Sequence, residues 1–480
     1  MTVRTPARII PGPKPMPVLN WRGNYWQFMN DPVQYLYRLY KSYGPLCGFV
    51  ETLDHQRLTI NGFGPDYNQL LLTNVDLFHT RSLSVDAGED TPLGRLGVGL
   101  PVMNGAHHRQ QRRLLMPAFH KKHLESYHNE MVSITEQVLA RWTPGETRNM
   151  AYEMQELTLR IVVTSLFGLD HQLAESLGHQ LEAWLKLNIS SGYLPLDWPS
   201  LPMRRLRNLS QDLETLILGI ITERRANAAQ NHDVLSMLLQ AKDEDGTGMT
   251  DHEMLGQVNM LFLAGTETSS NALAWTLFLL AQHPDILGDL VDELQGTLGG
   301  SAPTMEQLSK MPLLDHVIKE SLRLLPPASF ATRKSTDDFE IGPYHLVKGS
   351  VVLYSPFITH RLPDLYTHAA RFMPQRWQTI EPGPYEYLPF GSGTRMCIGA
   401  HFAVMEMKII LSLLLQRVHL ALVPNARIDR KEIVTLMLKH GLPMTIHSQD
   451  RQFSRVAIRG NLLEMIDIPD VSSRHSVWSL

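Results

Sequence analysis

The chain has few cysteines, no long apolar run and no excess of basic residues, which are features that define other classes of protein. It contains only two cysteines, Cys47 and Cys397, in 480 residues. Two thiols far apart do not make a disulfide framework, and low cysteine usage is typical of a reducing compartment, so we expect a cytoplasmic protein. No apolar run is long enough to span a bilayer, and we expect no secretory signal. A net charge of −4 provides no basic excess for nucleic-acid binding.

The apolar periodicity predicts one mainly helical domain. Apolar residues make up 43% of the chain, as in globular proteins. Residues 106–300 are almost continuously helical in pattern, and a capping box at 250–253 begins a long helix that ends before Pro284. Shorter strands follow residue 328, and the pattern predicts a β-hairpin over 433–448. The pattern also predicts helices over residues 285–298, 311–325 and 399–417.

No repeat or linker divides this pattern. We therefore predict a single domain over residues 1–448, with a proline-rich N-terminal lead over about 1–20. The fold class is mainly α with a small β-rich part. Residues 449–480 are more polar and fit no period, which indicates a flexible or partner-facing tail of unknown role.

The most informative segment is FGSGTRMCIGAHFAVMEMK at 390–408. Cys397 stands directly before a predicted helix, where unpaired N–H groups and the helix dipole favour a thiolate. Arg395 supplies a positive charge for an anionic cofactor edge. Glycines around the cysteine allow tight turns and close approach of a flat ligand: Gly391, Gly393 and Gly399.

This segment resembles the Phe-x-x-Gly-x-Arg-x-Cys-x-Gly haem signature of the cytochrome P450 family. All five fixed positions match, namely Phe390, Gly393, Arg395, Cys397 and Gly399. The resemblance extends over about residues 10–448 and implies a triangular helical prism around a buried haem b. It also implies that Cys397 is the axial ligand of the haem iron, with Phe390, Gly391 and Gly399 among the cofactor contacts.

A second motif, AGTET at 264–268, lies within the long helix. Gly265 weakens the helix, and polar side chains in an apolar stretch need partners or a task. By resemblance this is the family's oxygen-activation segment, with Ala264 and Gly265 included. Thr268 would hydrogen-bond bound dioxygen, and Glu267 would relay protons.

Two further motifs have the order that the family shows. Glu320 and Arg323 would ordinarily form a minor surface salt bridge. The resemblance instead implies a buried structural triad with Arg376 that holds the cysteine loop. For the haem propionates it implies His108, where the family commonly has Trp, together with three arginines: Arg112, Arg395 and, as a third partner, Arg333.

The segments expected to contact substrate are mostly apolar, which indicates a hydrophobic substrate such as a fatty acid, terpenoid, steroid or polyketide. Arg81 and Arg95 are either anchors for a carboxylate or solvent-facing residues. The expected contact residues are Leu261, Leu263, Ala328, Phe330, Leu436 and Met437.

The resemblance implies a monooxygenase that inserts one atom of dioxygen into its substrate. No flavin or iron–sulfur segment is recognisable, so electrons would come from a separate ferredoxin or flavodoxin with its reductase. One alternative is a peroxide-driven peroxygenase or a haem-thiolate isomerase or dehydratase, although Thr268 and Glu267 argue against it. Another is a haem sensor or ligand carrier without turnover.

Overall fold

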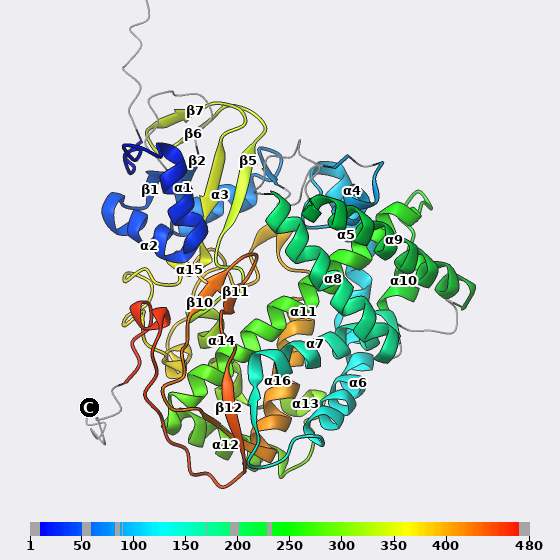
Figure 1. Ribbon diagram of the computed structural model, residues 1–480, viewed down its shortest axis with the longest axis vertical. Helices are drawn as coiled ribbons and strands as arrows, with labels where there is room; N and C mark the ends of the chain where they lie inside the picture. Colours follow the sequence, from blue (N-terminus) through cyan, green and yellow to red (C-terminus); the bar gives the residue numbers. More distant parts are fainter. Residues whose placement is uncertain are drawn as a thin grey trace, which may run out of the picture.

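The computed structural model describes residues 10–49, 59–81, 87–88, 90–169, 171–192, 201–227 and 233–469. Figure 1 shows a β-rich part at the upper left and helices through the rest of the molecule. The helices are α1 (Trp21–Asn30), α2 (Pro32–Tyr43), α3 (Pro65–Thr73), α4 (Pro92–Leu96), α5 (Gly105–Leu115), α6 (Lys121–Leu139), α7 (Met150–Phe167), α8 (His171–Gly192), α9 (Leu201–Asn227), α10 (Val234–Gln240), α11 (Asp251–Ala281), α12 (Pro284–Leu298), α13 (Met305–Leu308), α14 (Pro312–Leu324), α15 (Pro356–Thr359) and α16 (Ala400–Arg417).

The strands are short and form four sheets within the described residues. The largest has the order β1-β2-β8-β5-β3, with β2 and β8 parallel and the other neighbours antiparallel. The strands are β1 (Leu46–Gly48), β2 (Thr59–Gly62), β3 (Phe78–Thr80), β4 (Thr147–Asn149), β5 (Ala331–Ser335), β6 (Phe339–Ile341), β7 (Tyr344–Leu346), β8 (Val351–Tyr354), β9 (Val418–Leu422), β10 (Arg430–Glu432), β11 (Leu436–Leu438) and β12 (Pro443–Ser448).

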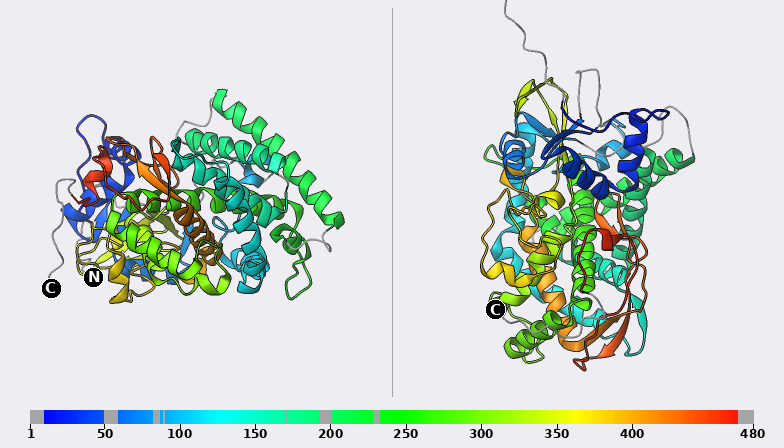
Figure 2. Two further views of the ribbon diagram at one scale, coloured as in Figure 1. Left: turned by 90° about the horizontal axis from the view of Figure 1, so that it is seen from below. Right: turned by 90° about the vertical axis from the view of Figure 1, so that its left-hand side faces the viewer.

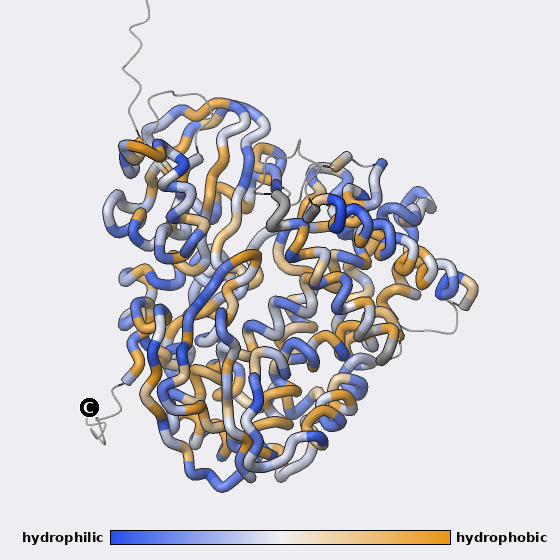
Figure 3. Tube along the Cα trace, in the orientation of Figure 1, coloured by the Kyte–Doolittle hydropathy of each residue, from blue (hydrophilic) through white to orange (hydrophobic). Residues whose placement is uncertain are grey.

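The central helix α11 confirms the long helix that the sequence predicts. Its capping box is complete: the Thr250 hydroxyl accepts from the Glu253 N–H, and the Glu253 carboxylate accepts from the Thr250 N–H. Every residue of 272–281 is buried, and α11 packs on α7, α14 and α16. The peripheral helices alternate hydrophobic and hydrophilic positions (Figure 3), because one face of each packs inward.

The predicted hairpin over 433–448 is wrong. β11 pairs with β10, in the register Arg430↔Leu438, whereas β12 joins β4 and β9 in another sheet. The two strands separate at Gly441, whose φ of 77° turns the chain away. Alternation indicates strands but does not specify partners, so the true hairpin turn is at 433–435.

The described part of the C-terminal segment packs on the rest of the domain. Residues 449–469 run along one edge of the molecule (Figure 1). Leu462, Met465 and Ile466 are buried, and Arg430 donates to the Asn461 carbonyl. The sparse apolar residues pack singly, which is why no period revealed them. Residues 470–480 lie outside the described part.

The N-terminal lead also docks on the domain from residue 10 onward. Ile10 is buried, and the Gly48 N–H donates to the Pro11 carbonyl at 2.8 Å. Helices α1 and α2 lie at the outside of the molecule in each view (Figure 2). In the described part of the chain, no helix combines the length and apolarity needed to cross a membrane.

Candidate functional site

The loop before α16 is closed by backbone hydrogen bonds. The Cys397 N–H donates to the Phe390 carbonyl at 2.8 Å, and the Met396 N–H donates to Gly393 at 3.1 Å. Gly391 and Gly393 have φ values of 70° and 68°, a region that side chains with a Cβ rarely adopt. The local sequence thus bends the chain so that Cys397 stands two residues before the helix cap Gly399.

Cys397 is exposed in the described structure, although protein atoms lie on most sides of its thiol. Burial raises the pKa of Cys397, while the Gly399 N–H and the Arg112 guanidinium lower it. Desolvation of the thiol raises its pKa by more than the N–H groups at the helix start lower it, contrary to our expectation of a thiolate. A bound metal cation would stabilise the thiolate here.

Four basic side chains gather beside this loop although they come from separate elements. They are His108 and Arg112 on α5, Arg333 on β5, and Arg395 in the cysteine loop. Burial and Arg395 together lower the pKa of His108 to about 4. None of the four forms an ion pair with a carboxylate in the described part of the chain. Three arginines without a carboxylate partner, beside a neutral histidine, fit a ligand that brings its own carboxylates.

Among the described residues, the Arg395 guanidinium donates hydrogen bonds to uncharged acceptors only. Its Nη2 donates to the Met103 carbonyl at 2.7 Å and to Oδ1 of Asn104 at 2.8 Å. Its Nε is buried without a partner. Burial, followed by the nearby Arg333, lowers the pKa of Arg395 to about 10. An orphaned guanidinium N–H facing like charges fits a haem propionate.

The middle of α11 carries accessible surface inside an otherwise buried helix. Ala264 is exposed, and Gly265 and Thr268 are partly exposed, whereas the last turns of the helix are buried. The Thr268 hydroxyl donates to the Ala264 carbonyl at 2.6 Å. A Cβ on Gly265 would lie 3.0 Å from Val162 of α7, so glycine also permits the close packing of these helices.

Glu267 is held by a network that the sequence motifs did not reveal. The Thr435 hydroxyl donates to Oε1 of Glu267 at 2.6 Å, and Nδ2 of Asn271 donates to that hydroxyl at 3.0 Å. Burial raises the pKa of Glu267, and the Thr435 hydrogen bond opposes the rise. No local signal links Thr435 to the helix, because only the folded chain brings them together.

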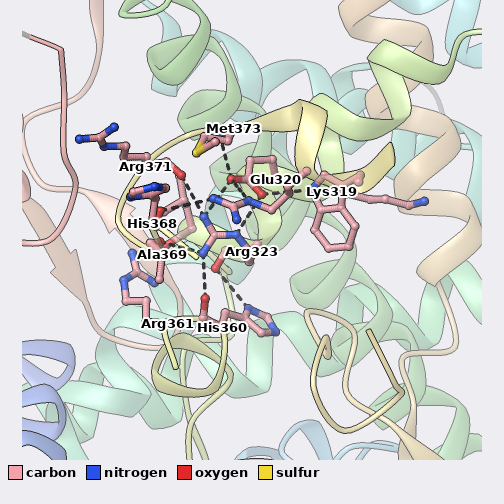
Figure 4. Close-up of polar contacts among 12 residues, drawn as sticks. Lys319, Glu320, Arg323, His360, Arg361, His368, Ala369, Arg371 and Met373 are labelled. Carbon is pink, nitrogen blue, oxygen red and sulfur yellow. Dashed lines mark hydrogen bonds and ion pairs between the residues drawn. The ribbon is translucent and has the colours of Figure 1, made fainter. Parts of the chain in front are cut away.

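The predicted triad assembles around one carboxylate. Glu320 accepts from Nε and Nη2 of Arg323 and from Nε of Arg376, each at 2.9 Å. It also accepts from the Met373 N–H and from Nε1 of Trp377. Figure 4 shows Glu320 and Arg323 at the centre of these contacts. All three charged side chains of the triad are buried, which agrees with a structural role.

His360 is a connecting residue that sequence reasoning missed. Its Nε2 accepts from the Leu388 N–H at 3.0 Å, and its Nδ1 lies 3.2 Å from the Arg323 carbonyl. It therefore joins the triad to the chain that leads into the cysteine loop. Complete burial lowers the pKa of His360 to about 3, so the ring is neutral.

The expected substrate contacts differ in accessibility. Ala328 is exposed, and Leu261, Leu263, Phe330 and Met437 are partly exposed. Leu436 has no accessible surface, because its backbone is tied to Pro327 and Trp275 and its side chain packs inward.

The two candidate anchor arginines also differ. Arg95 is engaged by both oxygens of Glu214, at 2.6 and 2.9 Å, and is not free for a ligand carboxylate. Arg81 is exposed.

The cysteine loop and the basic cluster beside it together provide a metal-ligating sulfur and partners for the carboxylates of a cofactor. The family model described as Cytochrome P450 matches residues 11–446, and the chain belongs to the cytochrome P450 family. Enzymes of this family use haem b, and this chain is a P450 monooxygenase.

Relatives and solved structures agree with that assignment. The chain is 30% identical to pentalenene oxygenase of Streptomyces avermitilis, over 86% of this chain and 92% of the relative. It is 34% identical to cyclooctatin synthase of Streptomyces melanosporofaciens, over 78% and 83% respectively. The structure of retinoic acid bound cyanobacterial CYP120A1 matches with a TM-score of 0.79 and 27% identity, covering 92% of this chain and all of that one.

Proposed function

We propose that this P450 monooxygenase oxidises a neutral, terpenoid-sized hydrophobic molecule in the cytoplasm. The observation that carries the proposal is the cysteine loop, with an accessible Cys397 and beside it a basic cluster that pairs with no carboxylate in the described part of the chain. When bound, haem b supplies the activation of dioxygen, so that one oxygen atom enters the substrate and the other leaves as water.

The residues of the loop would hold the cofactor from two sides. Cys397 would ligate the iron, with the Gly399 N–H donating to its sulfur. Arg112, Arg333, Arg395 and His108 would bind the propionates, and Phe390 and Gly391 would contact the cofactor. The triad of Glu320, Arg323 and Arg376 would keep the loop in place through His360.

The accessible segment of α11 would serve the reacting oxygen. Ala264 and Gly265 leave room for it, and the Thr268 hydroxyl would turn from the Ala264 carbonyl, to which it donates in this structure, to donate a hydrogen bond to it. Glu267 would hold and pass the proton that replaces one given up by Thr268. A raised pKa suits this task, because the carboxyl exchanges protons nearer to neutral pH.

The substrate class rests on accessibility and on relatives. Ala328, Phe330, Leu261, Leu263 and Met437 offer an apolar lining. Arg95 is occupied by Glu214, which weakens the case for a fatty-acid carboxylate. Two relatives are named for pentalenene and for cyclooctat-9-en-7-ol. These favour a polycyclic terpenoid.

Electrons would come from a separate ferredoxin or flavodoxin with its reductase, since we recognise no redox domain in the sequence. Arg109 and Arg113 on α5 are more than half exposed, and they belong to a basic face suited to an acidic donor. Both already pair with aspartates, Asp76 and Asp243, so a donor would have to exchange these ion pairs.

Three measurements test the proposal. Reduced protein with carbon monoxide should show the red-shifted absorption of thiolate-ligated haem, and a histidine-type spectrum would contradict it. Thr268→Ala should consume reducing equivalents but release peroxide. A substrate panel titrated by haem spin state should favour cyclic terpenes over fatty acids. Turnover with peroxide alone would indicate a peroxygenase, and ligand binding without electron use would indicate a sensor.

A further inference from the structure

The chain exposes an unusual number of large apolar side chains at its N-terminal end. Of the twelve large hydrophobic residues that the described structure exposes, five lie within residues 18–26. Val18 is 91% exposed and Trp26 65%. The others are Leu19, Trp21 and Tyr25. Single exposed apolar residues need no explanation, but a contiguous group indicates an interaction site.

The local structure holds these side chains outward. Residues 16–20 form a turn closed by reciprocal backbone hydrogen bonds between Met16 and Asn20. Its tip carries Val18 and Leu19, where turns ordinarily carry polar residues or glycine. The Asn20 side chain then caps α1 by accepting from the Trp21 N–H at 2.9 Å. The buried face of α1 is already occupied, so Trp21 and Trp26 are left on its outer side.

The charge around this surface has one sign. Residues 1–30 contain no Asp or Glu, but they contain Arg4, Arg8, Lys14 and Arg22. Lys14 and Arg22 are exposed, and the Arg22 guanidinium lies 5.7 Å from the centre of the Trp21 ring. The first acidic residue, Asp31, is paired with Arg430 at 2.8 Å and does not offset this charge.

We propose that this surface, defined by Val18, Leu19, Trp21, Arg22, Tyr25 and Trp26, docks the enzyme on an anionic lipid bilayer. Trp and Tyr have apolar rings with a polar N–H or O–H and favour the membrane interface. Basic residues beside them are attracted to anionic headgroups. A ten-residue helix is too short to span a bilayer, so α1 would lie in the interface plane.

An aromatic path leads from this surface toward the expected substrate contacts. Ring centres lie 6.4 Å apart for Trp21 and Tyr25, 6.5 Å for Tyr25 and Phe28, and 5.4 Å for Phe28 and Phe330. These packed rings are contacts and not a passage, but they place the docking surface and Phe330 on one aromatic cluster, so a substrate dissolved in lipid would be delivered close to the expected contacts. This use of the surface rests on the proposed function, whereas lipid binding itself does not.

The test is co-sedimentation of the full-length haem-loaded protein with vesicles. We expect binding to vesicles of phosphatidylcholine with phosphatidylglycerol, weaker binding to phosphatidylcholine alone, and release by salt. The double variant Trp21→Ser/Trp26→Ser should lower the partition coefficient at least about tenfold. Lys14→Glu/Arg22→Glu should weaken binding only to the anionic vesicles.

The matched control is Met116→Ser/Tyr152→Ser, which removes two side chains that are 50% and 52% exposed elsewhere. It should bind like the wild type. The haem spectrum and the unfolding midpoint of each variant show that it is folded. Absence of vesicle binding, or equal binding by the Trp variant, would overturn the proposal. A dimer that the Trp substitutions dissociate, without vesicle binding, would assign the surface to a second copy. Vesicle binding by a protein without a thiolate spectrum would refute only the proposed function.

Discussion

The Thr435 hydroxyl donates to Oε1 of Glu267, and Asn271 donates to the same hydroxyl. The Thr435 oxygen accepts from the amide N–H of Asn271, so its own proton is directed at the Glu267 carboxylate. One carboxylate oxygen is thereby committed, and the other is left to exchange protons. Thr435 is the last residue of the hairpin turn and directly precedes β11, which carries Met437, one of the expected substrate contacts.

Replacing Thr435 with Val should impair the coupling of electron use to product. The loss of a hydrogen bond to the ionised form should raise the pKa of Glu267 further. The pH at which coupling reaches half its maximum should therefore move upward, and peroxide release should increase. The measurement is peroxide and product per reducing equivalent across pH, with a surrogate ferredoxin and reductase.

Thr435→Ser should restore coupling, because it retains the hydroxyl. Thr445→Val, which removes an exposed strand hydroxyl paired with Thr147, is the control. If Glu267→Gln alters coupling but Thr435→Val does not, the positioning role of Thr435 is refuted. If neither does, the role of Glu267 itself fails.

Replacing Glu320 with Gln should release haem and destabilise the fold. Two buried guanidiniums, Arg323 and Arg376, would lose their counter-charge. Breaking a buried pair in this way costs about 3–5 kcal/mol. The measurements are haem retention on a desalting column and chemical unfolding. Glu306→Gln, which removes an exposed pair with Lys310, should change neither.

Replacing His360 with Phe should destabilise the protein most at neutral pH. The change leaves the Leu388 N–H without an acceptor, at a cost of about 1–3 kcal/mol. Wild-type His360 has a pKa of about 3 when folded, below its ordinary 6.5. The unfolded chain therefore binds more protons below pH 6.5, and the wild type loses stability there.

The penalty of His360→Phe should accordingly shrink by up to about 1.4 kcal/mol per pH unit below 6.5. Chemical unfolding at several pH values measures it. A penalty that does not change with pH would contradict the neutral buried ring. His360→Gln retains both an acceptor and a donor and should recover part of the stability.

Replacing Glu406 with Gln should alter the pH dependence in the opposite sense. Glu406 on α16 is fully buried, and burial raises its pKa to about 8 although the nearby Ser269 side chain opposes the rise. The folded state then binds more protons than the unfolded state between about pH 4.5 and 8. The wild type should lose stability as pH rises through this window, by up to about 1.4 kcal/mol per unit.

Glu406→Gln should lack this slope, so its stability relative to the wild type should improve from pH 5 to about 8 and level off above that pH. Unfolding midpoints of both proteins measured in parallel decide the matter. Parallel curves would show that Glu406 does not carry a proton in the folded protein. An exposed glutamate such as Glu306 provides the baseline for a change from Glu to Gln.

Features whose causes are local could be predicted from the sequence alone. The glycines at 391 and 393, the cysteine before a helix and the box of Thr250 and Glu253 act within a few residues, so their geometry follows from neighbouring letters. The resemblance to the family then implied the triad, and in the structure Arg323 and Arg376 both donate to the Glu320 carboxylate.

Contacts between distant segments could be found only in the folded chain. Thr435 lies 168 residues from Glu267, and Glu214 lies 119 residues from Arg95. The tertiary structure also paired β11 with β10 instead of β12 and buried part of the C-terminal segment. Strand alternation and single apolar residues are compatible with many partners. The choice among them is made by the packing of the whole chain, which no local pattern contains.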